Sequence, residues 1–349
     1  MTRIRVLFVT YASVPTDSSG TPMIGVIKRC ARLIAGLPRS ELEPQLLHFG
    51  PLPPHDPLLA EVLPSVVQHG VGFADPEGAL RRLYARIKPD VVVLGEGPGE
   101  GMMGTASDIA AVEGIPQLCV ENFYSPRQPD LFVRFSPAID QWLLLGLPNG
   151  FSYGRISPRA VLAPPLLPED VTLPRYRAKV TILGYDPAVA RMGFELLQKL
   201  PAGTTARLIG YPPSRIERSR APRSAPPVVP LPTDAELRGF LQTSRLIICK
   251  SGFQQIVESL ASGTPAIVYD AVGGVPEDWL HSSLRPFLRY FPADGDWSRV
   301  LAAAGIWLSR RPSMPWMAEI KAVRHPARVA SEALTRLVYG VVSGRRCPA

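Results

Sequence analysis

The 349-residue sequence lacks the long apolar runs of a membrane protein and the paired cysteines of a disulfide scaffold. Its apolar runs fall far short of the roughly 20 residues that a membrane span needs. The four cysteines stand far apart and only five histidines are present, so neither a disulfide framework nor a zinc site is indicated. The first ten residues do not show the pattern of a signal peptide. We therefore expect a cytoplasmic protein with no transmembrane segment.

Proline is abundant instead, at 39 residues, and predicts many loops because it interrupts helices and central strands. The 38 lysines and arginines exceed the 30 acidic residues, which gives a net charge of +8 and favours an anionic partner. No basic cluster is interleaved with aromatic residues, so a nucleic acid is not expected. A phosphorylated small molecule and an acidic membrane surface remain. Because single cores seldom exceed about 250 to 300 residues, we expect two domains.

In the first half of the chain, apolar β-branched segments alternate with amphipathic ones. We expect strands at 4–10, 90–94 and 117–121, helices at 23–37, 81–87 and 105–113, and a glycine-rich loop at 95–104. Such alternation is typical of a parallel sheet with right-handed crossovers. The basic residues of the first helix, Lys28, Arg29 and Arg32, are expected on a solvated face. The alternatives are weak peripheral contact of this face with an anionic membrane and contact with a phosphorylated acceptor.

Prolines crowd together at 161–174, where the periodicity lapses, and we place the domain boundary there. A second alternation follows, with strands expected at 179–184, 206–209, 228–229, 245–249 and 266–269 and helices at 188–200, 234–242 and 254–262. A last helical pattern covers 327–341. The predicted organisation is a Rossmann-like domain at 1–163, a linker at 164–178, a second Rossmann-like domain at 179–324, and a segment at 325–349 that returns to the first domain.

The segment 249–270 (CKSGFQQIVESLASGTPAIVYD) is the most informative part of the sequence. Ser251 and Gly252 stand where a strand meets the amino terminus of a helix, and the free N–H groups of such a terminus suit a phosphate or diphosphate. Glu258 lies further along the same helix and could accept hydrogen bonds from ribose hydroxyls. The alternative is that Ser251 caps the helix and Glu258 is an exposed helical carboxylate.

Lys250, Ser251, Gly252, Glu258 and the Gly-Thr-Pro turn at 263–265 resemble, in this spacing, the donor-binding segment of GT-B glycosyltransferases. The resemblance is closest to glycosyltransferase family 28, which includes the N-acetylglucosaminyltransferase of lipid II synthesis. Segment 89–122 is similar to that family's first-domain pattern. Segment 24–30 resembles the helix start of the UDP-sugar hydrolase of pseudaminic acid biosynthesis.

This resemblance implies an α/β fold in which two Rossmann-like, doubly wound domains face each other across a cleft (GT-B). It implies a nucleotide-sugar, with UDP-sugar expected, as a co-substrate and not as a tightly bound cofactor. The donor side would comprise Gly184, Lys250, Ser251, Gly252, Phe253, Gln254, Gln255, Glu258, Glu277 and Asp278. The acceptor side would comprise Gly20, Gly97, Gly99, Glu121 and Asn122. The acceptor would be a small molecule or lipid-linked.

The sequence also departs from the family at several positions. Val26 stands where the relatives carry a histidine, and the loop that begins at Gly184 retains a single glycine. The glutamine pair that contacts the donor sugar is absent, and Glu277 and Asp278 stand nearest to its place. We therefore expect that recognition of the donor sugar differs from that of the family, or is lost.

An inverting transfer needs a base at the acceptor hydroxyl and positive or dipolar groups at the departing diphosphate. Lys250 and the N–H groups after it would supply the second requirement, and no metal site is expected. The candidates for the base are Asp17, Glu96 and Glu100, all at carboxyl ends of expected strands, and Asp17 is favoured. For each of them a turn or a solvated loop carboxylate is the alternative.

The function predicted from the sequence is that of a metal-independent inverting glycosyltransferase of secondary metabolism or of cell-envelope glycan synthesis. Two alternatives stay open. One is a nucleotide-sugar hydrolase or epimerase on the same fold, and the other is a catalytically silent, nucleotide-binding partner subunit.

Overall fold

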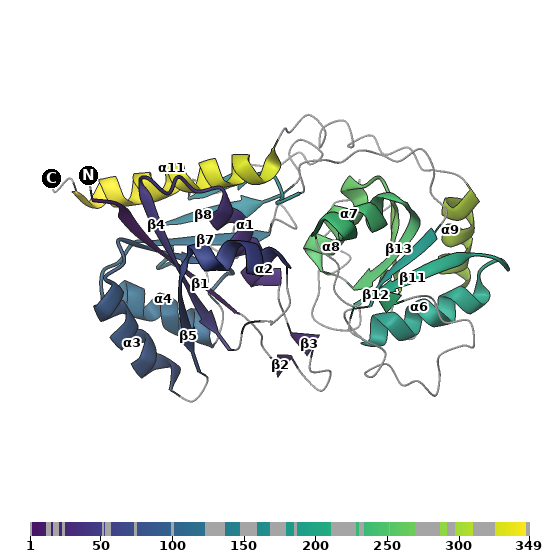
Figure 1. Cartoon of the computed structure of the whole chain (residues 1–349), viewed down its shortest axis with the longest axis horizontal. Coiled ribbons are helices and arrows are strands. Elements are labelled where there is room, and N and C mark those ends of the chain that lie inside the picture. The colour runs from purple at the N-terminus through teal and green to yellow at the C-terminus, as the bar shows by residue number, and fades with distance from the viewer. Residues whose placement is uncertain are drawn as a thin grey trace. The chain divides into compact units, whose positions relative to one another are not determined.

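The computed structural model describes residues 2–11, 15–16, 21–22, 25–50, 52, 57–72, 75–98, 101–122, 137–146, 159–167, 179–184, 187–210, 228–229, 234–250, 252–269, 287–291, 297–309 and 325–346. The chain forms two compact units. Unit 1 comprises Met1–Leu166 together with His325–Ala349, and unit 2 comprises Leu167–Arg324. Each unit contains one parallel sheet flanked by helices (Figure 1).

Unit 1 is built on a seven-stranded parallel sheet. Its strands are β1 (Ile4–Tyr11), β4 (Leu42–Phe49), β5 (Val67–Val71), β6 (Val91–Leu94), β7 (Gln117–Asn122), β8 (Gln141–Leu145) and β9 (Ala160–Ala163). They lie in the order β5-β4-β1-β6-β7-β8-β9. A short antiparallel pair, β2 (Pro15–Thr16) with β3 (Thr21–Pro22), follows β1 in the chain. Strands β1, β6 and β7 consist largely of buried residues, as expected of strands covered on both faces.

Helices cover both faces of this sheet (Figure 1). The helices of unit 1 are α1 (Gly25–Ala35), α2 (Pro57–Val62), α3 (Pro76–Ile87), α4 (Met102–Val112) and α11 (Pro326–Arg346), with a 3-10 turn at η1 (Leu63–Ser65). One apolar core joins the sheet to α1, α2 and α11, and a second joins it to α3 and α4. Helix α11 is tied to α1 by a hydrogen bond from the Ser331 hydroxyl to the Leu33 carbonyl, at 3.0 Å.

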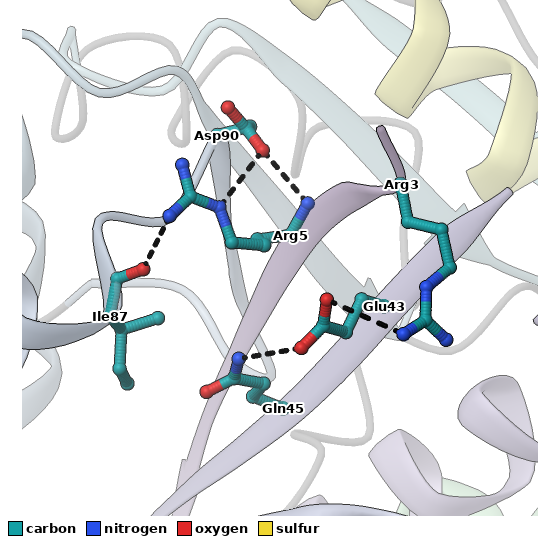
Figure 2. A network of polar contacts seen from close by, with 6 residues as sticks. All are labelled: Arg3, Arg5, Glu43, Gln45, Ile87 and Asp90. Atoms are coloured by element: carbon teal, nitrogen blue, oxygen red, sulfur yellow. Dashed lines mark hydrogen bonds and ion pairs between the residues drawn. The ribbon is translucent and has the colours of Figure 1, made fainter. Parts of the chain in front are cut away.

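A polar network holds the amino-terminal edge of the unit 1 sheet together (Figure 2). The backbone N–H of Arg5 donates to Asp90 at 2.9 Å, and its guanidinium donates to the Ile87 carbonyl at 2.9 Å and approaches Asp90 at 3.4 Å. These contacts join β1 to the segment that enters β6. Arg3, directly before β1, lies 3.9 Å from Glu43 on the neighbouring strand β4. The network is at the opposite end of the strands from the carboxyl edge, where ligands of such sheets bind.

The difference in geometry between Arg5 and Arg3 predicts a difference in stability. We expect Arg5→Met to lower the free energy of unfolding by about 1 kcal/mol, because it removes charge-assisted hydrogen bonds from a part-buried site. Arg3→Met is the matched control and should change it by less than about 0.5 kcal/mol, since that pair is longer and more exposed. Urea unfolding of the two variants measures both values. Equal losses would contradict the role assigned to Arg5.

Unit 2 is built on a six-stranded parallel sheet in the order β12-β11-β10-β13-β14-β15. Its strands are β10 (Lys179–Leu183), β11 (Thr205–Ile209), β12 (Val228–Val229), β13 (Ser244–Lys250), β14 (Ala266–Tyr269) and β15 (Leu288–Phe291). Its helices are α6 (Pro187–Lys199), α7 (Asp234–Gln242), α8 (Phe253–Ala261) and α9 (Trp297–Ser309). Helices α6 and α9 share one apolar core with the sheet, and α7 and α8 contact β13 from the other face (Figure 1).

The α/β class and the doubly wound parallel sheets expected from the sequence are confirmed. Two local expectations need correction. Residues 161–163, within the proline-rich stretch, form part of β9 and pair with β8. Leu166 and Leu167, in the first part of the predicted linker, are buried rather than extended into solvent. The remainder of the linker, 168–178, is outside the described residues.

Candidate functional site

The strand order reverses once in each sheet, and the point of reversal indicates where a ligand is expected to bind. In unit 1 the reversal falls between β1 and β6, and in unit 2 it falls between β10 and β13. Ligands of open doubly wound sheets bind beyond the carboxyl ends of the strands at such a switch point. In unit 2 the relevant strand ends are Leu183 and Lys250, and in unit 1 they are Tyr11 and Leu94.

At the unit 2 switch point, Lys250 ends β13 and α8 begins at Phe253. Gly252 is the N-cap residue, and it has no side chain that could accept a hydrogen bond from the start of the helix. The first N–H groups of α8, around Phe253 and Gln254, are therefore not occupied by the side chain of the N-cap residue. Together with the positive end of the helix dipole they form a site of the kind that binds phosphate. Ser251 lies outside the described residues.

Gly252, Lys250 and Gln255 lie close together at this junction. A Cβ atom placed on Gly252 would be 3.7 Å from Gln255 Oε1 and 3.8 Å from Lys250 Cε. Both distances are ordinary van der Waals contacts, and the φ of −77° at Gly252 is open to any residue. The fold itself does not require glycine here. Gln255 Oε1 is buried and accepts no hydrogen bond from the described residues.

Glu258 is 8% exposed, which rules out the solvated helical carboxylate that the sequence left as an alternative. It lies in the buried part of α8, and its backbone carbonyl accepts a hydrogen bond from the Ser262 hydroxyl at 2.9 Å. A buried carboxylate normally has a partner.

Gly184 directly follows β10, at the other side of the same switch point. A Cβ atom there would lie 2.4 Å from Leu208 Cδ1 and 3.1 Å from Ala190 Cβ. The close packing of β10 against β11 and α6 therefore explains this glycine without a ligand.

The unit 1 switch point holds a buried ion pair that spans three elements. Arg29 of α1 lies 3.2 Å from Glu121 of β7, and the two residues are 8% and 7% exposed. The Arg29 guanidinium also donates to the Gly95 carbonyl at the end of β6. Glu121 in turn accepts hydrogen bonds from the N–H groups of Gly97, at 3.0 Å, and Asn122, at 2.7 Å. This carboxylate, expected on the acceptor side, is thus engaged by the protein itself.

Glu96 lies between the two glycines that this ion pair contacts. Burial raises the pKa of its carboxyl, the neighbouring Glu121 raises it further, and Arg29 acts in the opposite direction. The same environment raises the pKa of Tyr11 to about 12, chiefly by burial and also through Glu96. Glu96 is the one described residue of the three candidate bases.

The remaining predicted site residues lie outside the described residues: Asp17, Gly20, Gly99, Glu100, Ser251, Glu277 and Asp278. Within the described ranges, no group of histidine, cysteine, aspartate and glutamate side chains has the arrangement of a metal site. The sequence does contain one Asp-x-Asp stretch, at 294–296, which falls in the undescribed segment 292–296. Among the described helices, none has the length and apolar run required to cross a bilayer.

Arg29 is the residue that sequence reasoning placed wrongly, since it is buried and not on a solvated face. A signal for its burial was present. Arg29 stands three residues after Val26 and four before Leu33, so it lies on the same helix face as these buried residues. The prediction placed Arg29 on the solvated face because charged side chains are usually exposed, although the spacing indicates the buried face.

No protein-family model matches the chain, and no curated protein matches it. Solved structures do. A UDP-N-acetylglucosamine 2-epimerase from Listeria monocytogenes aligns with a TM-score of 0.65 at 12% identity, over 98% of this chain and 97% of that one. MurG of Acinetobacter baumannii aligns with a TM-score of 0.56 at 15% identity, over 97% and 99%.

The spinosyn rhamnosyltransferase SpnG, solved with thymidine diphosphate, aligns with a TM-score of 0.62 at 15% identity, over 96% of this chain and 100% of that one. These neighbours are GT-B glycosyltransferases and related enzymes, matched over nearly their whole length at low identity. Two units with parallel sheets of Rossmann strand order, and full-length similarity to such enzymes, show that this chain has the GT-B fold.

Proposed function

We propose that the protein is a glycosyltransferase that takes a sugar from a nucleoside diphosphate donor, with UDP the expected nucleotide. The observation that carries this proposal is the junction of β13 and α8 at the unit 2 switch point. There Lys250 and the start of α8, whose N-cap residue is a glycine, provide a cation and N–H donors at one place. The structures of the same fold that were solved with nucleotides or named for nucleotide-sugars support a donor of this class.

In the proposed reaction, an acceptor hydroxyl oxygen forms a bond to the anomeric carbon of the donor sugar as the bond from that carbon to the diphosphate breaks. The negative charge that develops on the diphosphate is stabilised by Lys250 and the first N–H groups of α8. The hydroxyl proton passes to a carboxylate, which we assign to Glu96. A raised pKa brings this carboxyl nearer to the pH range in which a general base is most effective.

Gly252→Ala is expected to weaken UDP binding by about 10- to 100-fold without changing stability. The protein leaves room for a methyl group at this position, so the free energy of unfolding should not change. A diphosphate at the start of α8 would be displaced by that methyl group and lose a charge-assisted hydrogen bond, which contributes about 1.5 to 3 kcal/mol. Isothermal titration calorimetry with UDP and with TDP measures the affinity, and urea unfolding measures the stability.

Gly239→Ala in α7 is the matched control, because a Cβ atom at Gly239 meets nothing within 4 Å and the position lies in a different helix from the proposed site. It should bind UDP as the unsubstituted protein does. Equal UDP affinity of the Gly252 and Gly239 variants would overturn the proposed donor site.

The reaction itself is tested by incubation with a UDP-sugar in the presence and absence of an acceptor panel. Transfer requires an acceptor and releases UDP together with a glycosylated product. Release of free sugar without an acceptor would replace the proposal with a hydrolase, and a change of sugar configuration without release would replace it with an epimerase. Binding of UDP without any turnover would indicate a silent nucleotide-binding subunit. A thermal-shift screen of UDP-, TDP- and GDP-sugars identifies the donor, since a ligand that binds the folded state raises its stability.

A further inference from the structure

The backbone on both sides of Glu96 is held by the same buried ion pair. On one side, the Gly95 carbonyl accepts a hydrogen bond from Arg29, while the Gly95 N–H donates to the Val9 carbonyl of β1 at 2.9 Å. On the other side, the Gly97 N–H donates to Glu121 Oε2 at 3.0 Å. The Arg29–Glu121 contact closes this arrangement. The position of Glu96 at the end of β6 thus depends on two residues that are distant in the sequence.

Stability alone does not explain why a charged pair occupies this place. Two buried charges lose their hydration, and this loss offsets most of their mutual attraction. An apolar pair of similar volume is often as stable or more stable. The surrounding cores on both faces of the sheet are apolar. The pair is therefore better explained by its hold on the backbone around Glu96 than by its contribution to the folding free energy.

We propose that the Arg29–Glu121 ion pair is a positioning device that fixes Glu96 at the unit 1 switch point and sets its electrostatic environment. Arg29 and Glu121 are positioning residues in this scheme, and Glu96 is the group that touches the substrate. The catalytic role of Glu96 in this proposal rests on the proposed function. Its structural part, the coupling of Glu96 to the pair, does not depend on the reaction.

The two members of the pair act on Glu96 with opposite sign. The groups around Glu96 are Glu121 and Cys119 of β7, Arg29 and Cys30 of α1, and Tyr11 of β1. Burial raises the pKa of Tyr11 to about 12 and that of Cys30 to about 11, and it raises the pKa of Cys119 well above its ordinary value. These three groups stay protonated near neutral pH. Among the described residues named here, Arg29 and Glu121 are then the ones that carry a charge beside Glu96.

The test is the titration of the Glu96 carboxyl by carbon-13 NMR in the full chain without substrate, with Glu96→Gln identifying its resonance. Arg29→Met should raise the pKa of Glu96, because it removes the neighbouring cation. Glu121→Gln should lower it, because it removes the neighbouring anion. Arg82→Met is the control: Arg82 forms an exposed pair with Asp75 on α3, and its loss should leave the titration unchanged. Shifts of the same sign in the two variants, or no shift in either, would overturn the proposal.

Arg29→Lys keeps the charge if Arg29→Met does not fold. Lysine cannot donate to Gly95 and Glu121 in the geometry of a guanidinium fork. We expect a nearly unchanged titration of Glu96 but a kcat lower on the order of 10²-fold, with KM and UDP affinity unchanged, because a small misplacement of a reacting group has an effect of that size. An unchanged kcat would overturn the positioning role. If the unsubstituted protein turned over no nucleotide-sugar, the proposed function would fail, whereas the titration would still test the coupling.

Discussion

Arg29→Met is expected to lower the free energy of unfolding by about 3–5 kcal/mol, the cost of breaking a buried ion pair from one side. The substitution leaves the Glu121 carboxylate buried without its cation, and it removes the donor to the Gly95 carbonyl. The carboxylate keeps the Gly97 and Asn122 N–H donors but has no counter-ion, and the Gly95 carbonyl loses the Arg29 donor, in a buried site. Urea unfolding followed by far-ultraviolet circular dichroism measures the loss.

A double variant separates charge from packing. In Arg29→Met with Glu121→Gln both charges are absent. Gly97 and Asn122 donate to different oxygens of Glu121, so the single glutamine oxygen can still accept from one of these two N–H groups. This variant should recover most of the stability, because removing both partners of a buried pair costs far less than removing one. If it were as unstable as Arg29→Met, the loss would come from packing and the description of the pair would be wrong.

Gly95→Ala is expected to lower the free energy of unfolding by about 1–3 kcal/mol and to reduce turnover strongly. A Cβ atom at Gly95 would lie 2.7 Å from Cys30 Sγ, 2.9 Å from Val26 Cγ1 and 3.1 Å from the Val9 carbonyl oxygen. Because the two shortest contacts are with short, buried side chains of α1 and the third is with the backbone of β1, α1 would have to move away from the sheet, at a cost typical of overpacking. The movement would carry Arg29 with it and release the loop that contains Glu96.

The affinity for UDP should not change in Gly95→Ala, since the proposed donor site is in unit 2. Stability, turnover and UDP binding measured on the same preparation therefore give three separate results. Gly340→Ala in α11 is the control: a Cβ atom there meets nothing within 4 Å, and alanine in place of a helical glycine should stabilise by about 0.5–1 kcal/mol. Unchanged stability of Gly95→Ala would contradict the close approach of α1 to the end of β6.

The alternation of apolar and amphipathic segments was sufficient to predict most helices and strands in the chain. The segment 234–242 was predicted as a helix and 266–269 as a strand, with the bounds that the structure shows. The prediction was weaker at α3, which begins at Pro76 and not at 81. Its apolar periodicity starts only at Leu80, whereas its first turn is fixed by proline and by the Asp75 side chain, which accepts from the Gly78 N–H.

Other elements gave no usable signal. No prediction was made for seven strands (β2, β3, β4, β5, β8, β9 and β15) and two helices (α2 and α9). The pairing of strands such as β8 and β15 depends on neighbouring strands that are distant in the chain. The buried position of Glu258 was also not decided by the sequence. A carboxylate on a helix is usually exposed, and only the packing of α8 against β13 and β14 places this one inside.

The sequence by itself determined the two α/β sheets and the strand-to-helix junction at Lys250 and Gly252, because these depend on local periodicity and on short-range spacing. The expectation of a GT-B fold came from the resemblance of that junction to a known family. The tertiary structure alone decided that Arg29 meets Glu121, 92 positions away in the chain. In a parallel sheet, the order of the strands selects which carboxyl ends become neighbours, and that order is set by packing over the whole sheet. The chemistry proposed for unit 1 therefore became visible only once β1, β6 and β7 lay side by side.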